Sequence, residues 1–161
     1  MIRVCLLTLS VVALLPLTTT AADNVGRQPA GFPVLVQADG LKWAAGPPAL
    51  PKGAQIAVLY GDPAKEGPFV YRLKLPAGYK VPPHTHPNDE NVTVLSGTLR
   101  IGMGDTLDEA IGEAVKAGGY LHMPRGMRHY AMFSEDTIIQ LSGTGPTDIT
   151  YVNPTDDPRN Y

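Results

Sequence analysis

The stretch Gly78–Gly97 constrains this chain more than any other segment, because it combines prolines with closely spaced metal-binding side chain types. It reads Gly-Tyr-Lys-Val-Pro-Pro-His-Thr-His-Pro-Asn-Asp-Glu-Asn-Val-Thr-Val-Leu-Ser-Gly. The prolines on either side of the two histidines exclude a helix and favour extended backbone. On a strand, His84 and His86 are two residues apart, so they point to the same face.

A carboxylate follows on what we predict to be the next strand. Glu90 comes after a Pro-Asn-Asp turn and shares its parity with Val92 and Val94, so it is expected on the apolar face. Asp89 has the opposite parity and points away. Two imidazoles and a carboxylate on one interior face are the ingredients of a divalent metal site.

A second segment, Gly118–His129, contains a short strand, a Pro-Arg-Gly turn and a histidine that begins another strand. His129 has the parity of Ala131 and Phe133, which predicts an inward direction for all three. His122 has the opposite parity from its apolar neighbours on the short strand, so we interpret it as a residue that does not bind the metal.

Together the two segments resemble the paired motifs of the cupin family. The first motif, G-x5-H-x-H-x3-E-x6-G, is matched at Gly78, His84, His86, Glu90 and Gly97. The second motif, G-x5-P-x-G-x2-H-x3-N, is matched at all positions but the last, by Gly118, Pro124, Gly126 and His129.

The departure is Phe133, which stands where the family has Asn, a residue that is not usually a metal ligand. The resemblance covers roughly residues 56–153. It implies a small jelly-roll barrel, often a homodimer, with activities that range over dioxygenases, decarboxylases, isomerases and plain ligand binding. Fold does not choose among these.

The pattern of short alternating segments also predicts an all-β, antiparallel barrel. The 17 glycines and 16 prolines are spread as turns between apolar runs. We predict a signal peptide at 1–22, an N-terminal arm at 23–54, the barrel at 55–153 and an exposed C-terminal tail at 154–161.

The first 22 residues are typical of a secretory signal peptide, with an early Arg3, an apolar run and a small-residue end at Ala21-Ala22. The alternative is a membrane anchor, but the run is shorter than the ~20 residues of a spanning helix. Cleavage predicts a secreted or periplasmic protein without cysteine, because Cys5 is the only one. Loss of Arg3 changes the net charge from −2 to −3, and the basic residues form no cluster, so nucleic acid and membrane are poor partners.

Several local expectations follow from the same patterns. The almost wholly apolar segment Gln55–Gly61 predicts a buried strand. Tyr71 and Gln140 are the inward polar candidates. Tyr71 is interpreted as a core residue with a satisfied hydroxyl, and contact with the metal pocket is the alternative. The remaining strand predictions are an N-terminal hairpin of Val34–Gln37 and Leu41–Trp43, Phe69–Leu75, Thr98–Gly104 with Met103 inward, Glu113–Lys116, Tyr120–Met123, Thr137–Ser142 and Ile149–Val152. Outward apolar side chains at Val70, Tyr130 and Met132 favour a homodimer.

The chemistry expected of the site is binding of one divalent metal by His84, His86, Glu90 and His129. Nitrogen and oxygen ligands suit Zn, Fe, Mn, Ni, Co or Cu. Four protein ligands leave a position open for a small-molecule substrate if the metal is five- or six-coordinate. Three functions stay open: a metal-dependent enzyme of oxygenase type, a non-catalytic module that binds or senses a small ligand, and a structural or storage barrel. Metal binding is expected to weaken below pH ~6.5, because protonated imidazole is not a ligand.

Overall fold

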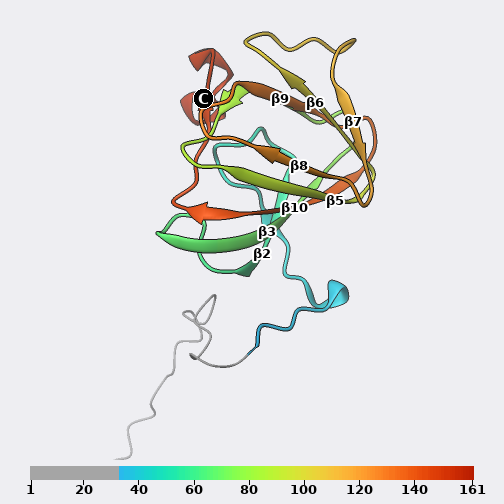
Figure 1. Cartoon of the computed structure of the whole chain (residues 1–161), viewed down its shortest axis with the longest axis vertical. Helices are drawn as coiled ribbons and strands as arrows, with labels where there is room; N and C mark the ends of the chain where they lie inside the picture. Colours follow the sequence, from blue (N-terminus) through green and yellow to red (C-terminus); the bar gives the residue numbers. More distant parts are fainter. Residues whose placement is uncertain (1–32) are drawn as a thin grey trace, which may run out of the picture.

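The computed structural model describes residues 33–161, and the predicted signal peptide lies outside them. Almost all of the regular structure in this range is β-strand (Figure 1). The strands are β1 (Ala44–Ala45), β2 (Gln55–Tyr60), β3 (Gly67–Leu75), β4 (Lys80–Thr85), β5 (Glu90–Ser96), β6 (Thr98–Met103), β7 (Glu113–Lys116), β8 (Tyr120–Met123), β9 (His129–Met132), β10 (Thr137–Gly145) and β11 (Thr150–Tyr151). Among the described residues, no helix has the length and apolar character needed to cross a membrane.

The strands form two antiparallel sheets that pack face to face. One has the order β1-β2-β3-β10-β5-β8 and the other β11-β4-β9-β6-β7. Figure 1 shows β9, β6 and β7 in one layer and β10, β3 and β2 in the other. The prediction of an all-β jelly roll is confirmed, with the strands divided between two sheets.

Alternating side chains on β3 supply much of the core between the sheets. Phe69, Tyr71, Leu73 and Leu75 are all buried, as the sequence pattern predicts. The inward side chains of the partner strands meet them, among them Ile139 and Leu141 of β10 and Val92 and Val94 of β5. This apolar interior surrounds the space in which the candidate site lies.

The N-terminal hairpin prediction is wrong. Val34–Gln37 forms no strand, and Asp39-Gly40 belongs to a 3₁₀ turn, η1 (Ala38–Gly40), closed by a bond from the Gly40 N–H to the Gln37 carbonyl. The first strand is β1, two residues long and paired with β2. Leu35 is 82% exposed, so the segment has no apolar surface to pack on, and turn chemistry alone does not hold a hairpin.

The strand β2 is only partly buried, contrary to the prediction for Gln55–Gly61. Val58 and Tyr60 are 43% and 45% exposed. Only the two-residue β1 pairs with the outer side of β2, so most of β2 lies at the edge of its sheet. An apolar run in sequence does not distinguish such an edge strand from a central one.

The surface exposure expected of Tyr130 and Met132 is also wrong, because β9 is buried on both faces and their outward side is covered. Tyr130 is 1% exposed and Met132 is 7% exposed. The ring of Tyr130 occupies the space that a side chain at Gly102 would need, and its hydroxyl donates to the carbonyl of Asp108 in the loop after β6. Met103 at the end of β6, predicted inward, is 54% exposed. The homodimer stays a prediction that has lost two of its three supporting residues.

Two tyrosine hydroxyls attach the N-terminal arm to the sheets. Tyr151 of β11 donates to the carbonyl of Ala49 over 2.8 Å, and Tyr79 donates to the carbonyl of Pro51 over 2.5 Å. The arm therefore contributes Ala49 and Leu50 to the buried interior.

The predicted exposed tail is ordered in two 3₁₀ turns, η2 (Pro154–Asp156) and η3 (Pro158–Asn160). Arg159 in the second turn donates to the carboxylates of Asp148 and Asp157 and to the carbonyl of Ile149. These bonds fold the tail back onto the segment that precedes β11, an arrangement that proline-rich sequence alone does not indicate.

The bond between Tyr151 and Ala49 gives a test of the arm's attachment. Tyr151→Phe removes the hydroxyl and leaves a buried carbonyl without its partner, so we expect the free energy of unfolding to fall by about 1–3 kcal/mol. Urea unfolding monitored by fluorescence measures it. The matched control is Tyr161→Phe, whose hydroxyl bonds the Thr155 carbonyl at the exposed surface and should change stability by less than about 0.5 kcal/mol. Equal effects of the two variants would contradict the buried attachment.

Candidate metal centre

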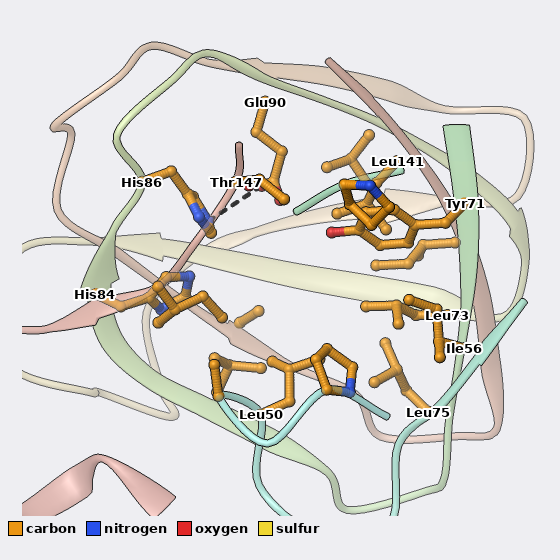
Figure 2. A pocket seen from close by; sticks show the side chains of 18 of the residues that line it. Leu50, Ile56, Tyr71, Leu73, Leu75, His84, His86, Glu90, Leu141 and Thr147 are labelled. Carbon is orange, nitrogen blue, oxygen red and sulfur yellow. Dashed lines mark ion pairs between the residues drawn. The ribbon is translucent and has the colours of Figure 1, made fainter. Parts of the chain in front are cut away.

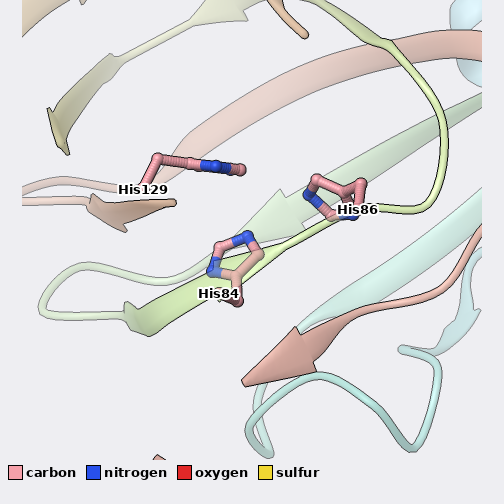
Figure 3. A group of neighbouring side chains, drawn as sticks. All are labelled: His84, His86 and His129. Carbon is pink, nitrogen blue, oxygen red and sulfur yellow. The ribbon is translucent and has the colours of Figure 1, made fainter. Parts of the chain in front are cut away.

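Antiparallel pairing of β4 with β9 brings two of the predicted metal ligands together. His84 lies opposite His129 in the register of these strands, and their ring centroids are 4.2 Å apart. His86 follows directly after β4, with its ring centroid 4.9 Å from that of His84 and 5.3 Å from that of His129. All three side chains are buried, and one ring nitrogen of each lies within 4.8 Å of the others (Figure 3).

Backbone carbonyls hold each of the three imidazoles through its Nδ1 atom. The partners are the carbonyl of Pro82 for His84 at 2.7 Å, of Asp148 for His86 at 2.8 Å, and of Met127 for His129 at 3.0 Å. A carbonyl oxygen only accepts, so each Nδ1 carries the proton and donates. In the neutral ring the lone pair is then on Nε2, which is the arrangement that metal-binding histidines have.

The carboxylate of Glu90 lies beside these rings. Its Oε2 atom is 3.5 Å from the Nε2 atom of His86 (dashed line in Figure 2). With Nδ1 of His86 protonated, this contact sets two acceptors against each other, which is unfavourable unless a cation or a proton lies between them. The donor set of three Nε2 lone pairs and one carboxylate therefore fits a divalent metal, and the metal would remove the conflict.

Burial keeps His84 and His129 neutral. It lowers the pKa of His84 to about 3, helped by the nearby His129 and His86, and it lowers the pKa of His129 to about 4. Burial raises the pKa of Glu90, and the nearby His86 opposes this change. Protons compete less for the Nε2 atoms of His84 and His129 than the ordinary imidazole pKa implies, so metal loss from these two ligands is expected at a more acid pH than 6.5.

The four side chains line a cavity of about 220 Å³ between the two sheets. Apolar side chains form most of its wall, drawn from both sheets and from the arm (Figure 2). An ion held by the four donors would border this cavity, so a small molecule inside it would be within reach of the metal. Leu50 of the arm and Thr147 before β11 belong to the wall, and no motif in the sequence indicates either of them.

Of the three other polar residues considered in the sequence, one lines the cavity and two lie on the outer surface of the sheets. His122 is exposed on the outer surface of β8, where its Nδ1 atom lies 3.0 Å from the Oδ1 atom of Asn91, so its predicted separation from the site is correct. Tyr71 lines the cavity, which was the alternative interpretation. Gln140 was predicted inward, and this is wrong. It pairs with Arg72 across the outer face, where Arg72 Nε donates to Gln140 Oε1 over 3.1 Å.

A protein-family model matches most of this chain. The model of the ChrR cupin-like domain matches residues 33–148, which include every strand except β11, both motifs and the candidate metal ligands. The chain belongs to this cupin family. The family resemblance found in the two motifs is thereby confirmed.

Curated relatives of this cupin domain include two plant proteins. It is 35% identical over 83 residues to germin-like protein subfamily 2 member 1 of Arabidopsis thaliana, and 34% identical over 82 residues to germin-like protein 3-1 of Oryza sativa subsp. japonica. These matches cover 51% and 48% of the chain. The chain spans a little over a third of the length of either relative, 37% and 36% respectively.

Solved structures share the cupin fold at low sequence identity. One from Methylibium petroleiphilum has a TM-score of 0.61 at 23% identity, over 82% of this chain and 89% of its own. An acetylacetone dioxygenase from Acinetobacter johnsonii gives 0.59 at 16% identity, over 83% and 85% of the two chains. The polyketide cyclase RemF from Streptomyces resistomycificus gives 0.56 at 19% identity, over 79% and 90%. At these identities the likeness concerns the fold alone.

The lowered pKa values predict how the stability of the metal-free cupin domain depends on pH. The unfolded chain protonates each histidine near pH 6.5, whereas folded His84 and His129 do so only near 3 and 4. Between these values the unfolded state binds more protons, so the stability contributed by the neutral rings is present above pH ~6.5 and is lost as the pH falls. With the metal removed by a chelator, we expect the urea concentration at the unfolding midpoint to be lower at pH 5 than at pH 7.5.

The raised pKa of Glu90 acts in the opposite direction, so a variant comparison is needed to isolate the histidines. In His84→Gln the loss of midpoint between pH 7.5 and pH 5 should be smaller than in the wild type. In His122→Gln, which changes an exposed ring, the loss should match the wild type. An equal loss of midpoint in His84→Gln and in the wild type would contradict a buried, neutral His84.

Proposed function

We propose that this cupin domain binds one divalent metal ion through His84, His86, Glu90 and His129, and that it catalyses an oxygenase-type reaction on a small organic molecule held in the cavity. The observation that carries the proposal is the convergence of three Nε2 lone pairs and a carboxylate on one apolar cavity. A bound metal supplies a Lewis acid and, if it is redox-active, a centre for oxygen chemistry.

The protein's own residues favour an open rather than a closed site. All four donors line the cavity. The side of the ion that faces the cavity would therefore have none of these four protein ligands. Closed four-coordinate sites are typical of structural metals. Here the apolar core between the sheets already supports the fold, and a structural ion adds little that the core lacks.

In this proposal the backbone carbonyls, Glu90 and the apolar wall each have a separate role. The carbonyls of Pro82, Asp148 and Met127 orient the three rings, and Glu90 supplies the negative charge. The apolar wall excludes water, which strengthens electrostatic interactions inside the site. The fold is shared with an acetylacetone dioxygenase, which supports an oxygenase, and also with a polyketide cyclase, so the fold alone does not choose the reaction.

A non-catalytic ligand-binding module is the second candidate. The observation that favours it is the scarcity of acid–base groups in the cavity wall. Apart from the four proposed ligands, the polar side chains of the wall are Tyr71, Thr147 and Asp148, and Asp148 is paired with Arg159. Substrate-dependent oxygen uptake by protein loaded with Fe, Mn, Cu, Co or Ni supports the enzyme. Ligand-induced thermal stabilisation without uptake or product supports the binding module instead.

Metal content across a set of variants tests the ligands directly. The wild type, stripped with chelator and reloaded, should hold about one ion per chain by elemental analysis. His84→Ala and His129→Ala should lose stoichiometric metal, because each removes a nitrogen donor from the buried cluster. Glu90→Gln should retain less metal than the wild type, since the amide keeps the shape and loses the charge.

The matched control for that series is His122→Ala, which should keep the wild-type metal content. The protein should carry no histidine tag. Equal metal content in the wild type and in His84→Ala would refute the assignment.

We also propose that the protein functions outside the cytoplasm after cleavage near Asp23. The support is the sequence of residues 1–22. In such a compartment, affinity favours loading of Zn or Cu over Mn or Fe. Mass spectrometry of the secreted or periplasmic fraction checks the mature N-terminus, and an intact Met1 on cytoplasmic protein would contradict cleavage.

A further inference from the structure

The wall of the cavity is polar at one end only. Figure 2 shows His84, His86 and Glu90 on one side of the cavity and Leu73, Leu75 and Ile56 on the other. Among the lining residues, all of which belong to the described range, there is no lysine or arginine. A charged group away from the metal would therefore lose its hydration without gaining a partner, which is unfavourable.

Apart from the proposed ligand Glu90, the wall has one acidic residue, Asp148, and its carboxylate is already paired. Asp148 is exposed, and its carboxylate lies 3.0 and 3.2 Å from Nη1 of Arg159 and also accepts the backbone N–H of Ile149. Arg159 in turn binds Asp157. These partners engage the Asp148 carboxylate at the surface, so the cavity interior has no cation beyond the metal that we propose.

Tyr71 is the one tyrosine in the wall, and its hydroxyl lies inside the cavity. It is 9% exposed, and its ring stacks on Phe69 with centroids 5.4 Å apart. Figure 2 shows its oxygen directed into the cavity, on the side where Glu90 and His86 lie. In the described part of the chain no protein group bonds this hydroxyl, and no fully shielded side-chain oxygen or nitrogen lacks a partner, so the hydroxyl opens onto the cavity.

At neutral pH this hydroxyl is a hydrogen-bond donor. Burial raises the pKa of Tyr71 well above its usual range, and the charge of nearby Glu90 raises it further. The proton therefore stays on the oxygen at neutral pH, where it can be donated. An unpartnered donor beside a metal cluster is suited to an oxygen atom of a bound molecule.

We propose that the ligand of this cavity carries its oxygen atoms at one end and only uncharged, apolar groups at the other, and that the Tyr71 hydroxyl donates a hydrogen bond to those oxygens. The proposal rests on the metal site above, because the metal anchors the oxygen end. It names the class of molecule that the proposed function leaves open. Molecules with a second carboxylate, a phosphate or an ammonium group far from the metal are excluded by the wall.

A matched pair of probes tests the apolar end. The probes are 4-isopropylcatechol and 3,4-dihydroxybenzoate, which share a two-oxygen metal-binding head and differ by two methyl groups against two carboxylate oxygens. Zinc-loaded protein is used because zinc has no redox chemistry. Titration calorimetry should show the isopropyl compound binding at least about tenfold more tightly, since the carboxylate finds no partner. Equal affinities, or no binding of 4-isopropylcatechol, would overturn the proposal.

A conservative substitution tests the role of Tyr71. Tyr71→Phe keeps the stacked ring and removes only the hydroxyl, so zinc content and thermal midpoint should stay close to those of the wild type. Affinity for 4-isopropylcatechol should fall by about 2- to 13-fold, the range for one net hydrogen bond. The control is Tyr120→Phe, whose hydroxyl donates to Asn91 on the outer surface and which should leave the affinity unchanged. Unchanged affinity in Tyr71→Phe would remove Tyr71 from the site.

The same series separates failure of this inference from failure of the metal site. If wild type and His84→Ala hold the same zinc, the metal assignment itself is wrong. If zinc binds as expected and the two probes bind equally, the metal site stands and only the ligand class is wrong. If His84→Ala without zinc binds 4-isopropylcatechol as tightly as loaded wild type, the metal is not the anchor of the ligand.

Discussion

The register between β4 and β9 is the constraint on which the candidate site depends. It sets His84 directly opposite His129, and a slip of one residue would turn one of the two rings to the other face of the sheet. β9 tolerates no such slip, because both of its faces are buried and Tyr130 fills the space above Gly102. Packing on the outer face of this sheet thus fixes the geometry of the inner one.

Sequence predicted the parts of the structure that depend on local periodicity and on motif spacing. Alternation on β3 gave the correct inward residues, and the parity of His122 placed it correctly outside the histidine cluster. The motif spacing brought out the three histidines, which converge in the structure. These successes share a cause, since strand parity follows from backbone geometry alone.

The failures concern surfaces that distant segments cover. Tyr130 and Met132 have outward parity, but their face is buried, with the loop after β6 accepting the Tyr130 hydroxyl. Gln140 looked like a covered polar residue facing inward, yet its partner Arg72 lies on the outer face. The carbonyl of Asp148, which orients His86 from 62 residues away, has no side-chain signature at all. Contacts between segments that are far apart in the chain cannot be predicted from a local sequence pattern.

The attachment of the arm through Tyr151 separates two properties along the chain. The candidate metal ligands come from the segments around β4, β5 and β9, whereas Leu50 and its neighbours close the cavity from a segment that provides none of those ligands. Substitutions in the arm can therefore reshape the space for a ligand while the donor set stays intact. Within one small domain, selectivity for a ligand and affinity for a metal ion would then be free to change independently of each other.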